Sequence, residues 1–318
     1  MDSRNGLSFW ERLVYCTKEA TPGALKTIWW VIRITAIVSL AIYILRLTGA
    51  LNWIGRELSP MMSFIGLPGE ASLAYVSGYF VNVYSAIAAC ASLNLSARSV
   101  TILAVLVMCS HNMIVETAVQ KKTGSSALRI FLVRTLSGLI LAYLLNLILP
   151  AGQQAELGAT VEEHLTLKES LWPWALSLLK LCVKMAVLIF LLSVLQQILS
   201  EFGVIKFLTK VIRWPMKFFG LPEDTSFLWI VANTLGLAYG AAVMFQEKEK
   251  GNISDREIQL LNTHIAISHS NLEDLILFVS IGGVWWIILL ARWAGSLILV
   301  WEERLEVHIR DKFTKFAG

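Results

Sequence analysis

The chain has 318 residues, of which 56% are hydrophobic and only 16% are charged. Soluble globular domains carry about 25% charged residues, so this composition excludes an ordinary soluble domain. The formal net charge of +4 says little about partners, because in a membrane protein the position of each Lys and Arg matters more than their sum. The composition therefore indicates a protein whose surroundings include the lipid bilayer.

Long apolar runs begin near residue 27 and recur along the chain. Each has about 20 residues, the length of helix that spans a hydrocarbon core of roughly 30 Å. They cover 27–45, 126–149, 175–199 and 282–301. The first run has no small-residue cleavage site after it, so we interpret it as a span rather than a signal peptide. These runs predict an all-α polytopic membrane protein.

Two further apolar segments, 70–91 and 224–245, carry polar residues and glycines in mid-run. The interruptions are Ser77, Gly78 and Asn82 in the first segment and Asn233, Thr234, Gly236 and Gly240 in the second. A chain that turns round inside a membrane must bury its unpaired backbone groups against protein or a wet cavity. We expect each segment to be a re-entrant helical hairpin that enters and leaves the membrane on the same side.

The two halves of the chain repeat the same motifs in the same order. FIGLPGEAS (64–72) matches FFGLPEDTS (218–226) at an offset of 154, and NLSARSVTIL (94–103) matches NISDREIQLL (252–261) at 158. The polar loop 246–252 can hold the four extra residues. An ordered series of matches over about 120 residues predicts an internal duplication.

Charge places the two halves in opposite orientations. The acidic linker 150–175 should be external, and the basic segment 200–222 and the tail should be cytoplasmic. Each half must then cross an odd number of times, which gives two inverted-topology repeats, each with a re-entrant hairpin and about three spanning helices. The expected regions are a cytoplasmic N-terminal segment (1–26), a first repeat (27–149), the external linker (150–175), a second repeat (176–302) and a cytoplasmic tail (303–318). The amphipathic segment 201–219 should lie at the headgroup level.

Ionisable residues lie in two otherwise apolar helical segments, 97–118 and 256–277. The first segment holds His111, Asn112 and Glu116, and the second holds His269, Asn271, Glu273 and Asp274. On continuous helices Asn112 would share a face with Glu116, and His269 with Glu273. An ionisable group at membrane depth costs at least ~2.5–3.5 kcal/mol, so these side chains indicate a functional site in the interior. The alternative is a pair of structural ion pairs with Arg134 and Arg292, although an Arg near a helix end can also snorkel to the membrane surface.

The order of hairpin, polar helix and final helix, duplicated in inverted form, resembles the Gate (nucleoside-recognition) domain. That domain is shared by concentrative nucleoside transporters, the membrane part of the ferrous-iron transporter B and the spore maturation proteins. The polar residues above resemble the Asn- and Glu-bearing helices with which nucleoside carriers contact substrate from two symmetry-related positions. The resemblance covers roughly 27–302, and this chain departs from the carriers by placing His111 and His269 beside its acidic residues. The resemblance implies a transporter but no one substrate.

These observations favour a secondary transporter of a small polar solute, nucleoside-like or another small metabolite, working by alternating access. We expect it to be proton- or cation-coupled, to lie in a bacterial cell (inner) membrane with both termini cytoplasmic, and to need no cofactor and no nucleic acid polymer. The expected substrate-binding residues are Ser77, Asn82, His111, Asn112, Glu116, Asn233, Thr234, His269, Asn271 and Glu273. The expected ion-coupling residues are His111, Glu116, His269 and Asp274.

Three alternatives stay open. The two His and two carboxylates suit a divalent transition metal as substrate. Helix N-termini after the GLP motifs suit an anionic substrate, but Glu70, Glu223 and Asp224 already occupy those ends. A non-transporting membrane subunit is the third, with a homo-oligomer or a second subunit as its partner. An enzyme is disfavoured, since the adjacent Ser110 and His111 point about 100° apart on a helix.

Overall fold

The structure is a computed structural model that describes residues 8–150 and 167–316. Within these ranges the chain forms helices and connecting turns without any strand. Four helices are long and apolar enough to cross a membrane, and one bent helix pair raises that number to five. The expectation of an all-α polytopic membrane protein is therefore confirmed.

The helices follow one another in the same order in both halves. The first half has α1 (Phe9–Leu47), α2 (Ala50–Phe64), α3 (Ala71–Phe80), α4 (Val83–Ala91), α5 (Ala97–Ser110), α6 (Met113–Lys122) and α7 (Ala127–Ile148). The second half has α8 (Leu167–Glu201), α9 (Val204–Phe218), the short 3₁₀ helix η1 (Glu223–Thr225), α10 (Ser226–Thr234), α11 (Leu237–Glu249), α12 (Asp255–Ile267), α13 (Glu273–Ser280) and α14 (Trp285–Phe316).

The first helix starts earlier than the sequence pattern predicts. It begins at Phe9, 18 residues before the apolar run at 27, and Ser8 provides its N-terminal cap. The Ser8 hydroxyl accepts a hydrogen bond from the Glu11 amide, and the Glu11 carboxylate accepts one from the Ser8 amide. This reciprocal pair is a capping box, a signal that the sequence analysis did not use.

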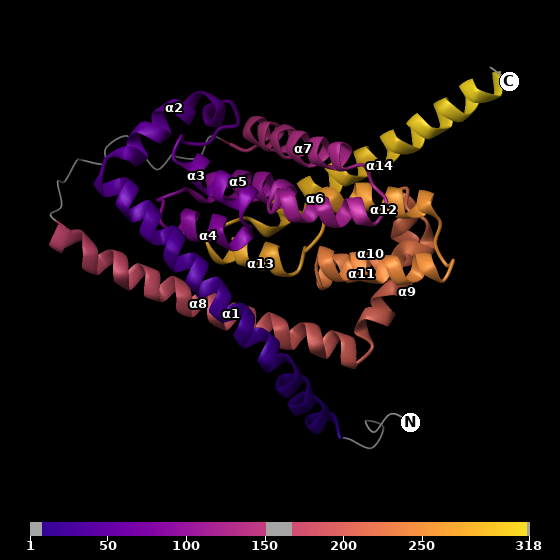
Figure 1. Cartoon of the computed structure of the whole chain (residues 1–318), viewed down its shortest axis with the longest axis horizontal. Coiled ribbons are helices and arrows are strands. Elements are labelled where there is room, and N and C mark those ends of the chain that lie inside the picture. Colours follow the sequence, from indigo (N-terminus) through magenta and orange to yellow (C-terminus); the bar gives the residue numbers. More distant parts are fainter. Residues whose placement is uncertain (1–7, 151–166, 317–318) are drawn as a thin grey trace.

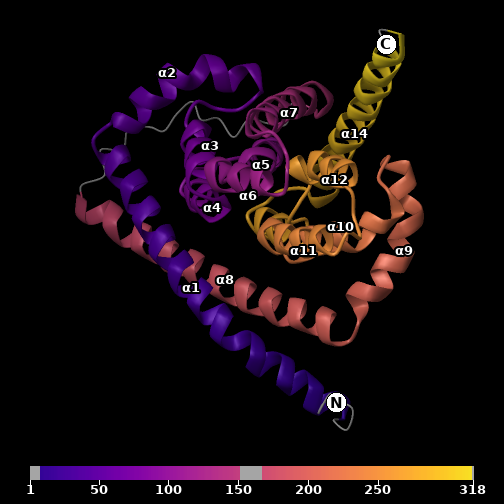
Figure 2. The same ribbon diagram turned by 45° about the vertical axis from the view of Figure 1, so that its right-hand side comes forward.

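Two long helices brace the molecule from outside. Helices α1 and α8 pack antiparallel, because Arg12 pairs with Glu201 at one end and Tyr43 stacks on Trp174 at the other. Figures 1 and 2 show α1, α2, α8 and α9 curving around the shorter inner helices. At the centre lies α5, which is buried at every residue from Val100 to Ser110. Helix α5, which leads to His111, is therefore one of the most buried segments of the described residues.

Each expected hairpin consists of two short helices that pack closely. Helix α3 turns into α4 at Asn82, whose side chain caps α4 by accepting from the Ser85 amide at 3.0 Å. A Cβ on Gly78 would lie 2.9 Å from the Ala86 Cβ, and one on Gly240 would lie 2.9 Å from the Ala232 Cβ. The mid-run glycines are therefore required for the close approach of the two hairpin arms. Re-entry from one side of the membrane stays a prediction.

The expectation that each polar segment forms one continuous helix is wrong. The first ends at Ser110 and resumes at Met113, and the second ends at Ile267 and resumes at Glu273. Asn112 and Ser270 adopt left-handed backbone conformations with φ of 46° and 51°. Asn112 and Glu116 therefore do not share a face of one helix, and neither do His269 and Glu273.

The two halves also share their backbone irregularities. Of the ten positive-φ residues in the described ranges, eight form four pairs at offsets of 154 or 158. The pairs are Gly49 with Gly203, Gly66 with Gly220, Asn112 with Ser270, and Gly124 with Gly282. Gly251, one of the remaining two, lies in the loop that holds the four extra residues. The duplication read from the motifs thus recurs in backbone conformation.

Substituting alanine at Gly66 should destabilise the protein more than at Gly203. Both positions have positive φ, so each substitution costs roughly 1–2 kcal/mol from backbone strain. A Cβ on Gly66 would also lie 1.9 Å from Asn146 Oδ1, which accepts a hydrogen bond from Arg98, whereas nothing lies within 4 Å of a Cβ on Gly203. Thermal unfolding in detergent measures both variants, and equal losses would contradict this account.

Candidate functional site

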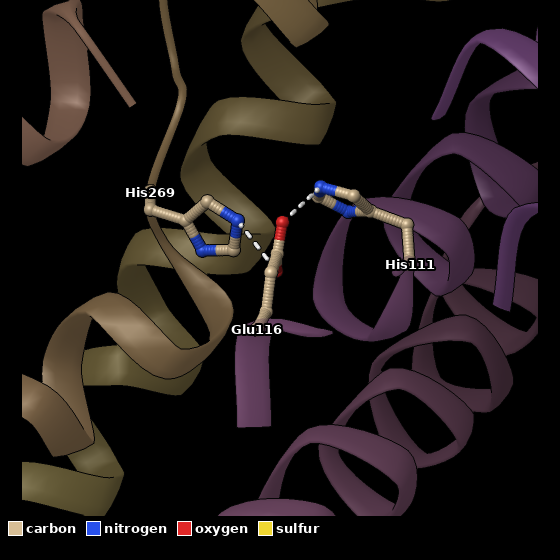
Figure 3. A group of neighbouring side chains, drawn as sticks. All are labelled: His111, Glu116 and His269. Carbon is tan, nitrogen blue, oxygen red and sulfur yellow. Dashed lines mark ion pairs between the residues drawn. The ribbon is translucent and has the colours of Figure 1, made fainter. Parts of the chain in front are cut away.

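Two histidines and two carboxylates from both halves of the chain meet at the helix breaks. The His111 and His269 ring centroids are 5.2 Å apart. Glu116, in the first turn of α6, lies between the two imidazoles (Figure 3), with Oε1 3.2 Å from His111 Nε2 and Oε2 3.1 Å from His269 Nε2. Asp274 Oδ2 lies 3.5 Å from His111 Nε2. We call these four residues the His–carboxylate cluster.

The cluster is largely buried. Its side chains are 5% (His111), 13% (Glu116), 0% (His269) and 7% (Asp274) exposed. Two surface hollows of about 380 and 280 Å³ lie elsewhere, lined by other residues. The cluster therefore lies in the interior of the protein, away from these two hollows.

Backbone carbonyls fix the orientation of both imidazoles. His111 Nδ1 lies 3.2 Å from the Val107 carbonyl oxygen, and His269 Nδ1 lies 2.7 Å from that of Ile265. A carbonyl oxygen can only accept a hydrogen bond, so each Nδ1 carries a proton and donates it. Each Nε2 is then left to face Glu116.

A buried arginine holds the first helix break open. Arg134 donates from Nε to the Cys109 carbonyl at 3.0 Å and from Nη2 to the His111 carbonyl at 2.7 Å. The same Nη2 lies 2.6 Å from Glu116 Oε2. The guanidinium thereby satisfies the free carbonyls at the negative end of α5 and positions the carboxylate.

Arg292 repeats these contacts in the second half. It donates to the Ile267 carbonyl at 2.7 Å and to the His269 carbonyl at 2.8 Å, which are the positions equivalent to Cys109 and His111. Its Nη1 binds the Asn271 side-chain oxygen at 2.6 Å instead of a carboxylate. Both arginines are fully buried, so neither snorkels to the membrane surface.

The hairpins contact the helix breaks through the backbone. The Asn112 amide donates to the Gly78 carbonyl at 2.9 Å, and the Ser270 amide donates to the Ala232 carbonyl at 3.1 Å. These bonds join α3 to the first break and α10 to the second at equivalent positions. Each hairpin is therefore hydrogen-bonded to the residue that directly follows one of the two cluster histidines.

Eight of the ten expected substrate-binding residues divide into two groups. His111, Glu116, His269, Asn233 and Asn271 lie together, because Asn233 accepts a hydrogen bond from Asn271 and Asn271 accepts one from Arg292. The Ser77 and Thr234 hydroxyls instead donate to carbonyls of their own helices, and Asn82 caps α4. Asn112 takes part through its backbone.

Sequence reasoning missed Tyr84. Its hydroxyl donates to the Glu273 carboxylate, which ties the first hairpin to the second half of the chain. No motif pointed to it, because a tyrosine in an apolar hairpin has no distinctive spacing. The 158-residue offset of the repeat pairs Arg134 with Arg292, but it does not predict that they bind backbone carbonyls.

The comparisons with known proteins agree with this architecture. The family model "Gate: Nucleoside recognition" matches residues 28–126, which include His111 and Glu116. An "Uncharacterized membrane protein YvoD" of Bacillus subtilis (strain 168) is 30% identical over 285 residues, covering 86% of this chain and 89% of that protein. This chain belongs to the Gate family. No solved structure matches it.

The family model ends before the second copy of the polar motif. Residues 28–126 span α1 to α6 except for the first 19 residues of α1, so His269 and Asp274 lie outside the matched range. The YvoD match extends over most of the chain and so reaches beyond the first half. In this Gate protein, half of the His–carboxylate cluster comes from a region that the family model does not match.

Removing Glu116 should partly rescue the loss of Arg134. Arg134→Met leaves a buried carboxylate unpaired, which costs roughly 3–5 kcal/mol. Adding Glu116→Gln removes that charge and should recover part of the melting temperature in detergent. Arg292→Met with Asp274→Asn is the matched control, because Arg292 binds the Asn271 amide and not Asp274. Equal recovery in the two double-mutant cycles would contradict the pairing.

Proposed function

We propose that this Gate protein is a secondary transporter of a small polar solute, nucleoside-like or another small metabolite, working by alternating access. We further propose that transport is coupled to a proton or another cation bound at the His–carboxylate cluster. The observation that carries the proposal is the burial of this cluster where the hairpins and broken helices of both halves meet. Ionisable groups at such depth mark substrate and ion pathways.

The helix breaks support this proposal. Transporters built from inverted repeats bind substrate near the membrane midplane, where broken helices expose backbone groups to the ligand. Both halves here have a hairpin and a broken helix joined at equivalent positions. With the acidic linker external and the basic segments cytoplasmic, the two halves would be inverted in a bacterial cell membrane, with both termini in the cytoplasm.

The buried cluster fits one step of such a cycle. Alternating access requires a state in which the site is closed to both sides, and opening needs a movable element on each side. The hairpins are suitable elements, since few backbone bonds link each of them to the helix break that it covers. Movement of one hairpin at a time would open the cluster to one side of the membrane.

One observation favours a second candidate, a non-transporting subunit of a membrane complex. Glu116 is bound to Arg134 in a closed interior, as a purely structural ion pair would be. Its equivalent in the second half differs, since Asp274 lies against His111 while Arg292 binds Asn271. The structural explanation therefore accounts for one carboxylate of the two, and we favour the transporter.

Loss of a cluster residue should abolish ligand binding without unfolding the protein. The wild-type protein in detergent is screened by thermal shift against nucleosides and small carboxylates, because a ligand that binds only the folded state raises the melting temperature. His111→Ala and Glu116→Gln should lose the shift given by the best ligand. Uptake into proteoliposomes then tests transport. Retained binding in both variants would refute the site, and binding without uptake would favour the structural subunit.

Cysteine labelling tests the proposed re-entrant hairpin. In a background without native cysteines, Glu70→Cys and Leu93→Cys at the two ends of the first hairpin should react with a membrane-impermeant thiol reagent from outside. Lys122→Cys, at the C-terminal end of α6, should react only from the cytoplasmic side. Labelling of residues 70 and 93 from opposite sides would show that α3 and α4 together span the membrane.

A further inference from the structure

The two imidazoles direct unprotonated Nε2 atoms toward the Glu116 carboxylate. Because Nδ1 of each ring donates to a backbone carbonyl, the neutral rings have lone pairs on Nε2. These nitrogens lie 3.2 and 3.1 Å from the two Glu116 oxygens, which are also acceptors. Acceptors that face each other in a buried site repel unless a positive group lies between them. Two protons or one metal ion would supply it.

The unpaired atoms favour a metal ion over two protons. His269 Nε2 and Asp274 Oδ2 are buried and have no hydrogen-bond partner among the described residues. The 3.1 Å contact from His269 to Glu116 therefore lacks the alignment of a hydrogen bond, so a proton on Nε2 would still be poorly satisfied. A metal ion lies off the line that joins two of its ligands and can bind His269 Nε2 together with ligand atoms of His111 and Glu116.

The spacing and chemistry of the atoms also suit a metal ion. For bonds of about 2.0–2.2 Å, the ligand atoms of a tetrahedral site lie roughly 3.3–3.6 Å apart. The two imidazole contacts, one to each Glu116 oxygen, are 3.1 and 3.2 Å long, close to that spacing. One ligand atom from each of His111, Glu116 and His269 lies within 4.8 Å of the others. Imidazole and carboxylate together select Zn, Mn, Fe or Ni, whereas Mg and Ca prefer oxygen ligands alone.

The surroundings of the ligands are those of a metal site. Metal-bound histidines commonly donate their second ring N–H to a carbonyl, as His111 and His269 do. Ligating carboxylates are themselves hydrogen-bonded, as Glu116 is by Arg134. Arg134 also offsets the charge of Glu116 when no metal ion is bound.

We infer that the His–carboxylate cluster binds a divalent transition-metal ion through Nε2 of His111, Nε2 of His269 and the Glu116 carboxylate, with a fourth position left for water. This inference rests on the same cluster as the proposed function and names the cation that it takes. Binding is measured without transport, so the two can fail separately. A protein that binds metal but moves no solute would refute the transporter and leave the metal site intact.

The test uses Co²⁺ as a spectroscopic probe with the full chain purified in detergent and freed of metal by a chelator. Titration with Co²⁺ should give visible absorption typical of a four- or five-coordinate site, saturating at one ion per chain. Zn²⁺ should abolish the absorption, and a large excess of Mg²⁺ should not. Absence of the absorption with no Zn²⁺ binding by calorimetry would overturn the inference, as would displacement by Mg²⁺.

Two ligand variants and one control variant locate the ion. His269→Ala and Glu116→Gln should raise the Kd for Co²⁺ by roughly 100-fold or more, since changes even to partners of ligands cost 10–100-fold. His264→Phe is the control, because His264 is equally buried on α12 but binds Trp229 and stands outside the cluster. Melting curves without metal establish that each variant is folded, and His111→Gln replaces any that is not. Unchanged Kd values in folded ligand variants would overturn the inference, as would equal losses in the control.

Discussion

Two buried guanidinium groups hold this protein's interior together. Each helix break leaves carbonyl groups without helical partners, and such groups cost several kcal/mol when no water reaches them. Arg134 and Arg292 bind these carbonyls at equivalent positions, one in each half. The histidines can therefore leave their helices and turn toward each other. Without the arginines, the free carbonyls at the ends of α5 and α12 would lose these buried partners.

The same arrangement gives the halves different chemistry. Arg134 also binds Glu116, but Arg292 binds the Asn271 amide and leaves Asp274 beside His111. Backbone conformation is thus repeated, whereas the partners of the two carboxylates are not. One carboxylate lies between both imidazoles, and the other contacts only His111. A repeated scaffold with unequal charges can bind a ligand at its centre without presenting two identical sites.

The outer helices expose apolar side chains, whereas the inner helices carry polar contacts. Large apolar side chains such as Phe207, Trp214 and Phe218 are exposed on α9, and similar residues are exposed along α1, α8 and α14. Polar groups are instead concentrated at the centre of the bundle, where Tyr84 and Glu273 link the two halves. This distribution reverses that of a soluble protein and suits a bilayer that covers the outside. The amphipathic α9 is consistent with a position at the headgroup level.

The sequence by itself determined the membrane class, the duplication with its two offsets, the paired hairpins and the residue types of the site. Composition and apolar length carry that information locally. Only the tertiary structure decided where the polar helices break, because nothing in the residues around Asn112 or Ser270 forces a left-handed turn. The break exists because Arg134 and Arg292, 23 residues beyond His111 and His269, bind the freed carbonyls. Local periodicity does not reveal contacts between segments far apart in the sequence, and the His–carboxylate cluster is built from such contacts.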